Sequence, residues 1–211
     1  MFDFIAKGGV LVTPILLCSV FALAIFVERL IRFAGMRKKG LGLEHRVAKR
    51  ISRGEDEKAL EMARTSDSPM GRVLARAVEV KDHDRETMET VIVNATDEEI
   101  RDLSAHVQTL ATITNIAPLL GLLGTVIGMI KAFMVIQEMG GKVNAAVLAG
   151  GIWEAMLTTA LGLSVALPAM LAHSYLVSKI DNYEARLQNG SVVFLTAVAG
   201  REKEGAGHAG S

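Results

Sequence analysis

A single carboxylate stands inside a long apolar segment of the chain. Glu154 is followed there by Thr158, Thr159 and Ser164. A charged Asp-like group at the centre of a bilayer costs roughly 2.5–3.5 kcal/mol on insertion scales, and somewhat less nearer the end of a span. Thr158 shares the helix face of Glu154, whereas Thr159 lies about 140° around the helix. So many polar groups predict a segment that packs inside a helix bundle or lines a water-filled path.

A second apolar segment combines glycines with one hydroxyl. Gly124 and Gly128 form a small-xxx-small pair, and Gly121 extends the same small surface. Such surfaces let two helix backbones approach closely in lipid, so the glycines predict helix packing. The hydroxyl of Thr125 can bond to its own helix or face a pore, and the sequence alone leaves both open.

Other kinds of chemistry find little support in the sequence. The five histidines have no metal-ligand spacing, and we find neither a phosphate-binding glycine loop with its lysine nor a Ser/His/Asp arrangement. The formal net charge is zero, so nothing indicates nucleic acid as a partner. One cysteine, Cys18, cannot form an intrachain disulfide. We therefore predict no enzymatic activity, no metal and no cofactor.

The elements that must position these residues are three membrane-spanning helices. Apolar runs at Val10–Val27, Ile116–Ile136 and Ala145–Val177 are each about long enough to cross a ~30 Å hydrocarbon core. The second and third runs contain Pro118 and Pro168, which neighbouring helices make tolerable within a span. The predicted fold class is therefore all-α, with three spans.

The first run has a competing interpretation. Ala22-Leu23-Ala24 resembles the cleavage site of a signal peptide. The apolar run continues beyond it through Val27, which favours a membrane span.

Positive charges predict the orientation of the spans. Lys and Arg crowd the segment after the first span and are sparse before it and between the second and third. By the positive-inside rule the N-terminus lies outside and the C-terminus lies in the cytoplasm. The expected organisation is an outer N-terminus with span one (1–28), a cytoplasmic helical domain (29–110), span two (111–137), an outer loop (138–144), span three (145–180), and a cytoplasmic helix with a tail (181–211).

The cytoplasmic region is expected to be helical. Apolar residues recur at three- and four-residue intervals from Met88 to Leu110, and neither Gly nor Pro occurs between Arg85 and Pro118. The pattern predicts one unbroken helix from Arg85 to Ile136, on the order of 75 Å long. Its polar face is solvated or docks another protein. The Gly-rich tail, 201–211, is expected to be disordered.

Two motifs in the second and third spans resemble the ExbB/TolQ/MotA proton-channel family. They are Ala117-Pro118 with Gly121-x-x-Gly124-Thr125-Val126-x-Gly128, and Gly151-Ile152-x-Glu154-Ala155-x-x-x-Thr159-Ala160-x-Gly162-Leu163 with Pro168. The three-span topology resembles the ExbB/TolQ branch more than MotA-like members, which have four spans.

The resemblance implies a motor. Family members form pentameric rings in which spans two and three line a central pore that holds single-span partners resembling ExbD or TolR. Ion flow through the bacterial inner membrane then drives work across the periplasm, through a transducer resembling TonB or TolA, for outer-membrane import or envelope maintenance. The expected partners are thus further copies of this chain, an ExbD/TolR-like subunit, the transducer and membrane lipid.

The resemblance also implies roles for individual residues. Thr125 and Thr159 match the pore threonines of the family, and Glu154 matches its glutamate in the third span. Pro118 and Pro168 match prolines at bends of the pore helices. Gly121, Gly124, Gly128 and Gly162 remain packing residues.

Three alternatives stay open at this stage. Thr158 beside Thr159 resembles the adjacent threonines of sodium-driven flagellar relatives, because an added hydroxyl could help replace the water shell of sodium. A membrane scaffold that conducts nothing would also fit the glycines. A secondary transporter fits poorly, because three spans offer no inverted repeat.

Overall fold

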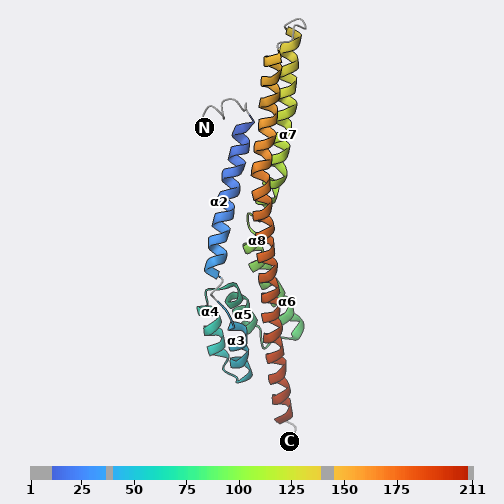
Figure 1. Ribbon diagram of the computed structural model, residues 1–211. Coiled ribbons are helices and arrows are strands. Elements are labelled where there is room, and N and C mark those ends of the chain that lie inside the picture. Colours follow the sequence, from blue (N-terminus) through green and yellow to red (C-terminus); the bar gives the residue numbers. More distant parts are fainter. Residues whose placement is uncertain (1–10, 37–39, 139–144, 209–211) are drawn as a thin grey trace. The chain divides into compact units, whose positions relative to one another are not determined.

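The structure is a computed structural model that describes residues 11–36, 40–138 and 145–208. The expected N-terminal segment before residue 11 and most of the expected outer loop, 139–144, lie outside the described residues. Every element in the described part of the chain is a helix, which confirms the all-α prediction. The helices are α2 (Val12–Met36), α3 (Leu43–Ser52), α4 (Asp56–Thr65), α5 (Pro69–Glu79), α6 (Arg85–Ser104), α7 (Val107–Glu138) and α8 (Ala145–His208) (Figure 1).

Three of these helices are long and apolar enough to cross a membrane. The qualifying segments are Val12–Met36, Val107–Glu138 and Leu148–Arg201, each of which contains an 18-residue stretch with a mean hydropathy of 2.1, 2.2 and 1.8, respectively. Most of their large apolar side chains are exposed in the single chain, including Phe21, Leu122 and Leu171. Exposed apolar surface of this extent is what lipid or neighbouring subunits cover in a membrane protein. Each of the three predicted spans thus falls in a helix that is a candidate for crossing a membrane.

The chain divides into two compact units. The membrane unit comprises residues 1–29 and 106–176, and the polar unit comprises 30–105 and 177–211. Both α2 and α8 contribute to each unit, because each helix continues beyond its apolar segment.

The polar unit has its own hydrophobic core. Apolar faces of α3, α4, α5 and α6 meet a stripe of α8 there, so that Leu43, Ile51, Leu74 and Phe194 are fully buried. The corner between α4 and α5 is tight, because Ser68 caps α5 by accepting a hydrogen bond from the amide of Gly71 at 3.1 Å. In Figure 1, α3, α4 and α5 form the compact cluster of short helices.

The prediction of one unbroken helix from Arg85 to Ile136 is wrong. The chain leaves the helix at Ala105, where ψ is 139°, and His106 adopts a left-handed conformation with φ of 62° before α7 begins. That conformation costs a residue with a side chain about 1–2 kcal/mol, although histidine tolerates it better than most. Arg29 of α2 is 2% exposed and donates a hydrogen bond to Nδ1 of His106 at 3.1 Å. A tertiary contact therefore accompanies the break in the helix, and no glycine or proline near it in the sequence predicts it.

The end of α8 also extends further than its composition indicated. The helix continues to His208, past Arg201, where the Gly-rich tail begins. Arg201 forms an ion pair with Asp56 of the polar unit at 2.8 Å, and Lys81 contacts the same carboxylate at 3.0 Å. These contacts tie the last part of α8 to the start of α4.

Candidate functional site

Small residues form the contact between α7 and α8, which we call the seam. The two helices run antiparallel and side by side in the membrane unit (Figure 1). Every residue of the seam is buried, and along each helix these residues recur at intervals of three or four. Its members are Ala117, Gly121, Gly124, Gly128 and Ala132 on α7, and Ala155, Thr158, Gly162 and Ala166 on α8.

The seam brings the two backbones into direct contact. A Cβ atom added to Gly162 would lie 2.6 Å from the carbonyl oxygen of Ala117 and 3.1 Å from Cα of Gly121. One added to Gly128 would lie 2.8 Å from Cβ of Ala155. Only glycine fits at such positions, so the sequence folds here because its smallest residues face one another.

Two threonine hydroxyls converge on one backbone carbonyl across the seam. The hydroxyl of Thr159 donates a hydrogen bond to the carbonyl oxygen of Gly121 at 2.9 Å. Thr158 also reaches this oxygen, at 3.4 Å, but donates more closely to Ala155 on its own helix, at 2.7 Å. Thr158 is only 3% exposed, whereas Thr159 is half-buried. The two adjacent threonines therefore have different surroundings.

Thr125 lies on the same side of the seam as Thr159. It is half-buried, and its hydroxyl donates to the carbonyl of Leu122 on its own helix at 2.6 Å. At 100° per residue, Thr125 and Thr159 each lie about 60° from the centre of the seam on their own helix. Because the helices are antiparallel, these rotations point to the same side of the pair. We call this side the threonine flank.

Glu154 lies on the opposite flank. Its carboxylate forms an ion pair with Lys131 of α7, with Oε1 and Nζ 3.8 Å apart. Five full turns along α8, on the same face as Glu154, Ala172 lines a groove of about 490 Å³ against α2. Phe26 of α2 closes part of this groove by an edge-on contact with Tyr175, with ring centroids 6.5 Å apart. Glu154 and α2 therefore share one flank, and the threonines occupy the other.

The two prolines lie within continuous helices. Pro118 is in α7 and Pro168 is in α8, and each lacks the amide that would bond the carbonyl four residues earlier. These carbonyls belong to Thr114 and Ser164, and Pro168 itself lines the groove against α2. The structure thus places a weakened turn in each of the two seam helices.

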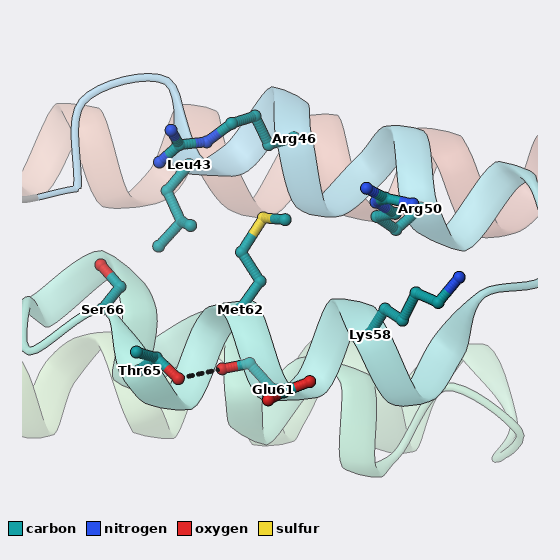
Figure 2. Close-up of a pocket in the computed structure, with 8 residues that line it drawn as sticks. All are labelled: Leu43, Arg46, Arg50, Lys58, Glu61, Met62, Thr65 and Ser66. Atoms are coloured by element: carbon teal, nitrogen blue, oxygen red, sulfur yellow. Dashed lines mark hydrogen bonds between the residues drawn. The ribbon is translucent and has the colours of Figure 1, made fainter.

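A second hollow lies in the polar unit, between α3 and α4. Figure 2 shows the side chains of Arg46, Arg50 and Lys58 around the apolar Leu43 and Met62. The cavity measures about 570 Å³ and is widely open, and Glu55 forms ion pairs with two of its three cations, Arg50 and Lys58. It is a shallow charged surface rather than a built site.

Two features of the site escaped the sequence analysis. The ion pair of Lys131 with Glu154 was not predicted. A lysine in one span and a glutamate in the next are a recognisable signal for such a pair, because a lone charge within a span is costly. The burial of Arg29 gave no signal, because arginines at the end of a first span are expected to reach water. In the described part of the chain, no group of three or more His, Cys, Asp or Glu side chains could hold a metal ion.

The fold and the seam together define a multi-pass helical membrane protein with hydroxyl groups held within its spans. Residues 65–189 match the MotA/TolQ/ExbB proton channel family, and this match covers more than half of the chain. The chain belongs to this family, as its motifs predicted.

The relatives are of the ExbB and TolQ kinds. The chain is 34% identical to the biopolymer transport protein ExbB-like 1 of Synechocystis sp. over 84% of its length and 71% of the relative. It is 39% identical to the biopolymer transport protein ExbB of Pseudomonas putida over 47% of its length and 30% of the relative. It is 38% identical to the Tol-Pal system protein TolQ of Haemophilus influenzae over 43% of its length and 39% of the relative. Within the family the chain stands with the ExbB/TolQ branch.

Proposed function

We propose that this chain is a subunit of an ion-driven motor in the bacterial inner membrane. In this proposal several copies, most simply five, form a ring around a single-span partner resembling ExbD or TolR. Ion flow through the ring does mechanical work across the periplasm, passed on through a transducer resembling TonB or TolA. Membership of the family and the names of its relatives, biopolymer transport and Tol-Pal proteins, support this assignment.

The observation that carries the proposal is the separation of the two flanks of the seam. Thr125 and Thr159 are half-buried on the flank away from α2, within otherwise apolar helices. A ring in which this flank faces the central axis would gather one pair of hydroxyls from each copy at one depth. Hydroxyls that exchange between donor and acceptor roles can hydrate or relay an ion where apolar side chains cannot.

The proposed ion is the proton. A sodium site would need several oxygens in place of the water shell, and Thr158 was the candidate for an additional ligand. Its hydroxyl is buried in the seam and already donates to Ala155. The threonine flank is left with Thr125 and Thr159, which suits a proton relay better than a sodium cage.

The orientation in this proposal follows the positive-inside rule. The many Lys and Arg residues that follow α2 support a cytoplasmic polar unit. The short connection between α7 and α8 then faces the periplasm, and so does the N-terminus.

Proton flux into liposomes tests the proposal. The protein is reconstituted with its single-span partner, and flux is driven by a membrane potential. We expect Thr125→Val and Thr159→Val each to lower the flux at least about tenfold, because a hydrogen bond to a charged group contributes about 1.5–3 kcal/mol. Ser164→Ala is the matched control, because Ser164 lines the groove against α2 and its hydroxyl donates to the carbonyl of Ala160 on its own helix.

The competing function is a scaffold that conducts nothing. It is favoured by the way in which Thr125, Thr158 and Thr159 all find acceptors within the chain. Absence of any partner-dependent flux from a folded complex would support the scaffold and refute the motor. Flux that survives both threonine variants would refute the relay.

A further inference from the structure

Lys131 and Glu154 face each other inside the membrane-spanning part of the seam helices. Lys131 lies seven residues before the end of α7, and Glu154 lies nine residues after the start of α8. At 1.5 Å per residue, these positions are about 10 Å and about 14 Å from the helix ends. The carboxylate and ammonium groups are 3.8 Å apart, with side chains 33% and 57% exposed.

The seam itself does little to fix helix register at this level. Around the ion pair, Gly128 faces Ala155 and Gly151 faces Ala132. These are the smallest side chains, so the ridges that would interlock two helices are low. Small residues allow the helices to approach closely, and a directional contact beside them favours one register.

An ion pair is well suited to this task. A lone charge in a span is expensive, and pairing with an opposite charge relieves that cost only at one alignment of the helices. The long stem of Lys131 covers apolar surface while its ammonium group reaches Glu154. Sliding α8 by one residue along α7 displaces the two groups by about 1.5 Å relative to one another along the helix axes and turns one away from the other.

The threonine contact depends on the same register. Thr159 lies five residues after Glu154, about 7.5 Å further along α8, and its hydroxyl meets the carbonyl of Gly121 at 2.9 Å. Because Glu154 is about 140° around the helix from Thr159, its carboxylate faces the α2 flank, away from the threonine flank.

We propose that Lys131 and Glu154 form an interhelical latch that sets the register of α7 and α8 and so positions Thr159 against Gly121. Glu154 is then a positioning residue, which acts through its pair with Lys131, and the ion does not bind to it. The flux arm of the test rests on the motor function proposed above, whereas the stability arm does not.

A charge-swap experiment distinguishes the latch from a direct role of the glutamate. Four variants are compared with wild type: Lys131→Met, Glu154→Gln, Lys131→Arg and the double variant Lys131→Glu with Glu154→Lys. Each is purified in detergent for its thermal unfolding midpoint, and reconstituted with the partner for proton flux. Lys131→Arg keeps the charge and serves as the conservative control.

If the latch exists, each single charge deletion should lower both the unfolding midpoint and the proton flux, and the charge swap should recover both. Lys131→Met and Glu154→Gln should each lower the midpoint and lower the flux at least about threefold, the lower part of the range for contacting residues. The swapped pair and Lys131→Arg should each have a midpoint close to that of wild type and a flux within about twofold of it. Unchanged midpoints in the single variants would overturn the latch.

Two further outcomes are informative. A swap that restores the midpoint while flux remains as low as in Glu154→Gln would place the carboxylate in the ion path and overturn the positioning role. If the folded wild-type complex conducts no protons, the motor proposal fails. The latch is then tested by the unfolding midpoints alone. It stands if the charge swap restores the midpoint that each single charge deletion lowers, and it fails if the swap does not.

Discussion

Adding one methyl group to Gly162 should separate the seam helices. The new Cβ would lie 2.6 Å from the carbonyl oxygen of Ala117, whereas ordinary contact begins near 3.4 Å. Its other neighbours are backbone atoms of Gly121, at 3.1 and 3.3 Å, which cannot rotate away as a side chain could. The helices must therefore move apart by about 0.8 Å at this level.

The cost follows from this displacement. Overpacking a tight contact costs typically 1–3 kcal/mol. Moving the helices apart also lengthens the bond from Thr159 to Gly121 from 2.9 Å to about 3.7 Å, beyond hydrogen-bonding range. Interhelical hydrogen bonds in membranes contribute about 0.6 kcal/mol on average. We expect Gly162→Ala to lose about 1.5–3.5 kcal/mol by these two effects.

Gly150→Ala is the matched control for this variant. Gly150 lies on the same helix, and an added Cβ would meet nothing within 4 Å. Both variants gain the same helix propensity, about 1 kcal/mol for glycine to alanine, so their difference isolates the contact. The free energy of unfolding is measured by denaturation in mixed detergent micelles. Equal stability of Gly162→Ala and Gly150→Ala would refute the reasoning about the seam.

Two further predictions concern the polar unit. Burial disfavours the charged form of Asp56, but hydrogen bonds from Arg201 and Lys81 outweigh it and lower the pKa of Asp56. A lowered pKa in the folded state gives stability that is present above the unfolded pKa, near 3.9, and lost as the pH falls through the folded value. Unfolding midpoints measured from pH 6 to pH 2 should therefore fall less steeply below about pH 4 in Asp56→Asn than in wild type, and parallel curves would contradict this. Ser68→Ala removes the buried cap of α5 and should cost about 1 kcal/mol in chemical denaturation, whereas Ser52→Ala, at an exposed helix end, should cost much less.

Much of the fold could be predicted from patterns that are local in the sequence. Apolar runs of sufficient length give the three spans, because the bilayer fixes how many residues are needed. The glycines of α7 predict close helix packing, because a residue without a side chain lets two helix backbones approach whatever the surrounding sequence is. Their partner surface on α8, with Ala155 and Ala166, is equally small but was hidden in a generally Ala-rich run.

The break between α6 and α7 could not be predicted in this way. No glycine or proline stands at His106 to indicate a left-handed turn, and the contact that accompanies it comes from Arg29, 77 residues earlier. Similarly, the difference between Thr158 and Thr159 depends on which face of α8 meets α7. Helical spacing gives the angle between two side chains, whereas only the packing gives the direction of each.

Thiol accessibility tests most directly the claim that the threonine flank faces a water-filled path. In a Cys18→Ala background, Thr125→Cys, Thr159→Cys and Ala172→Cys are made one at a time and assembled with the partner in membranes. A membrane-impermeant thiol reagent should label residues 125 and 159 rapidly and residue 172, which lines the groove against α2, slowly. Rapid labelling at residue 172 with none at residues 125 and 159 would contradict the account.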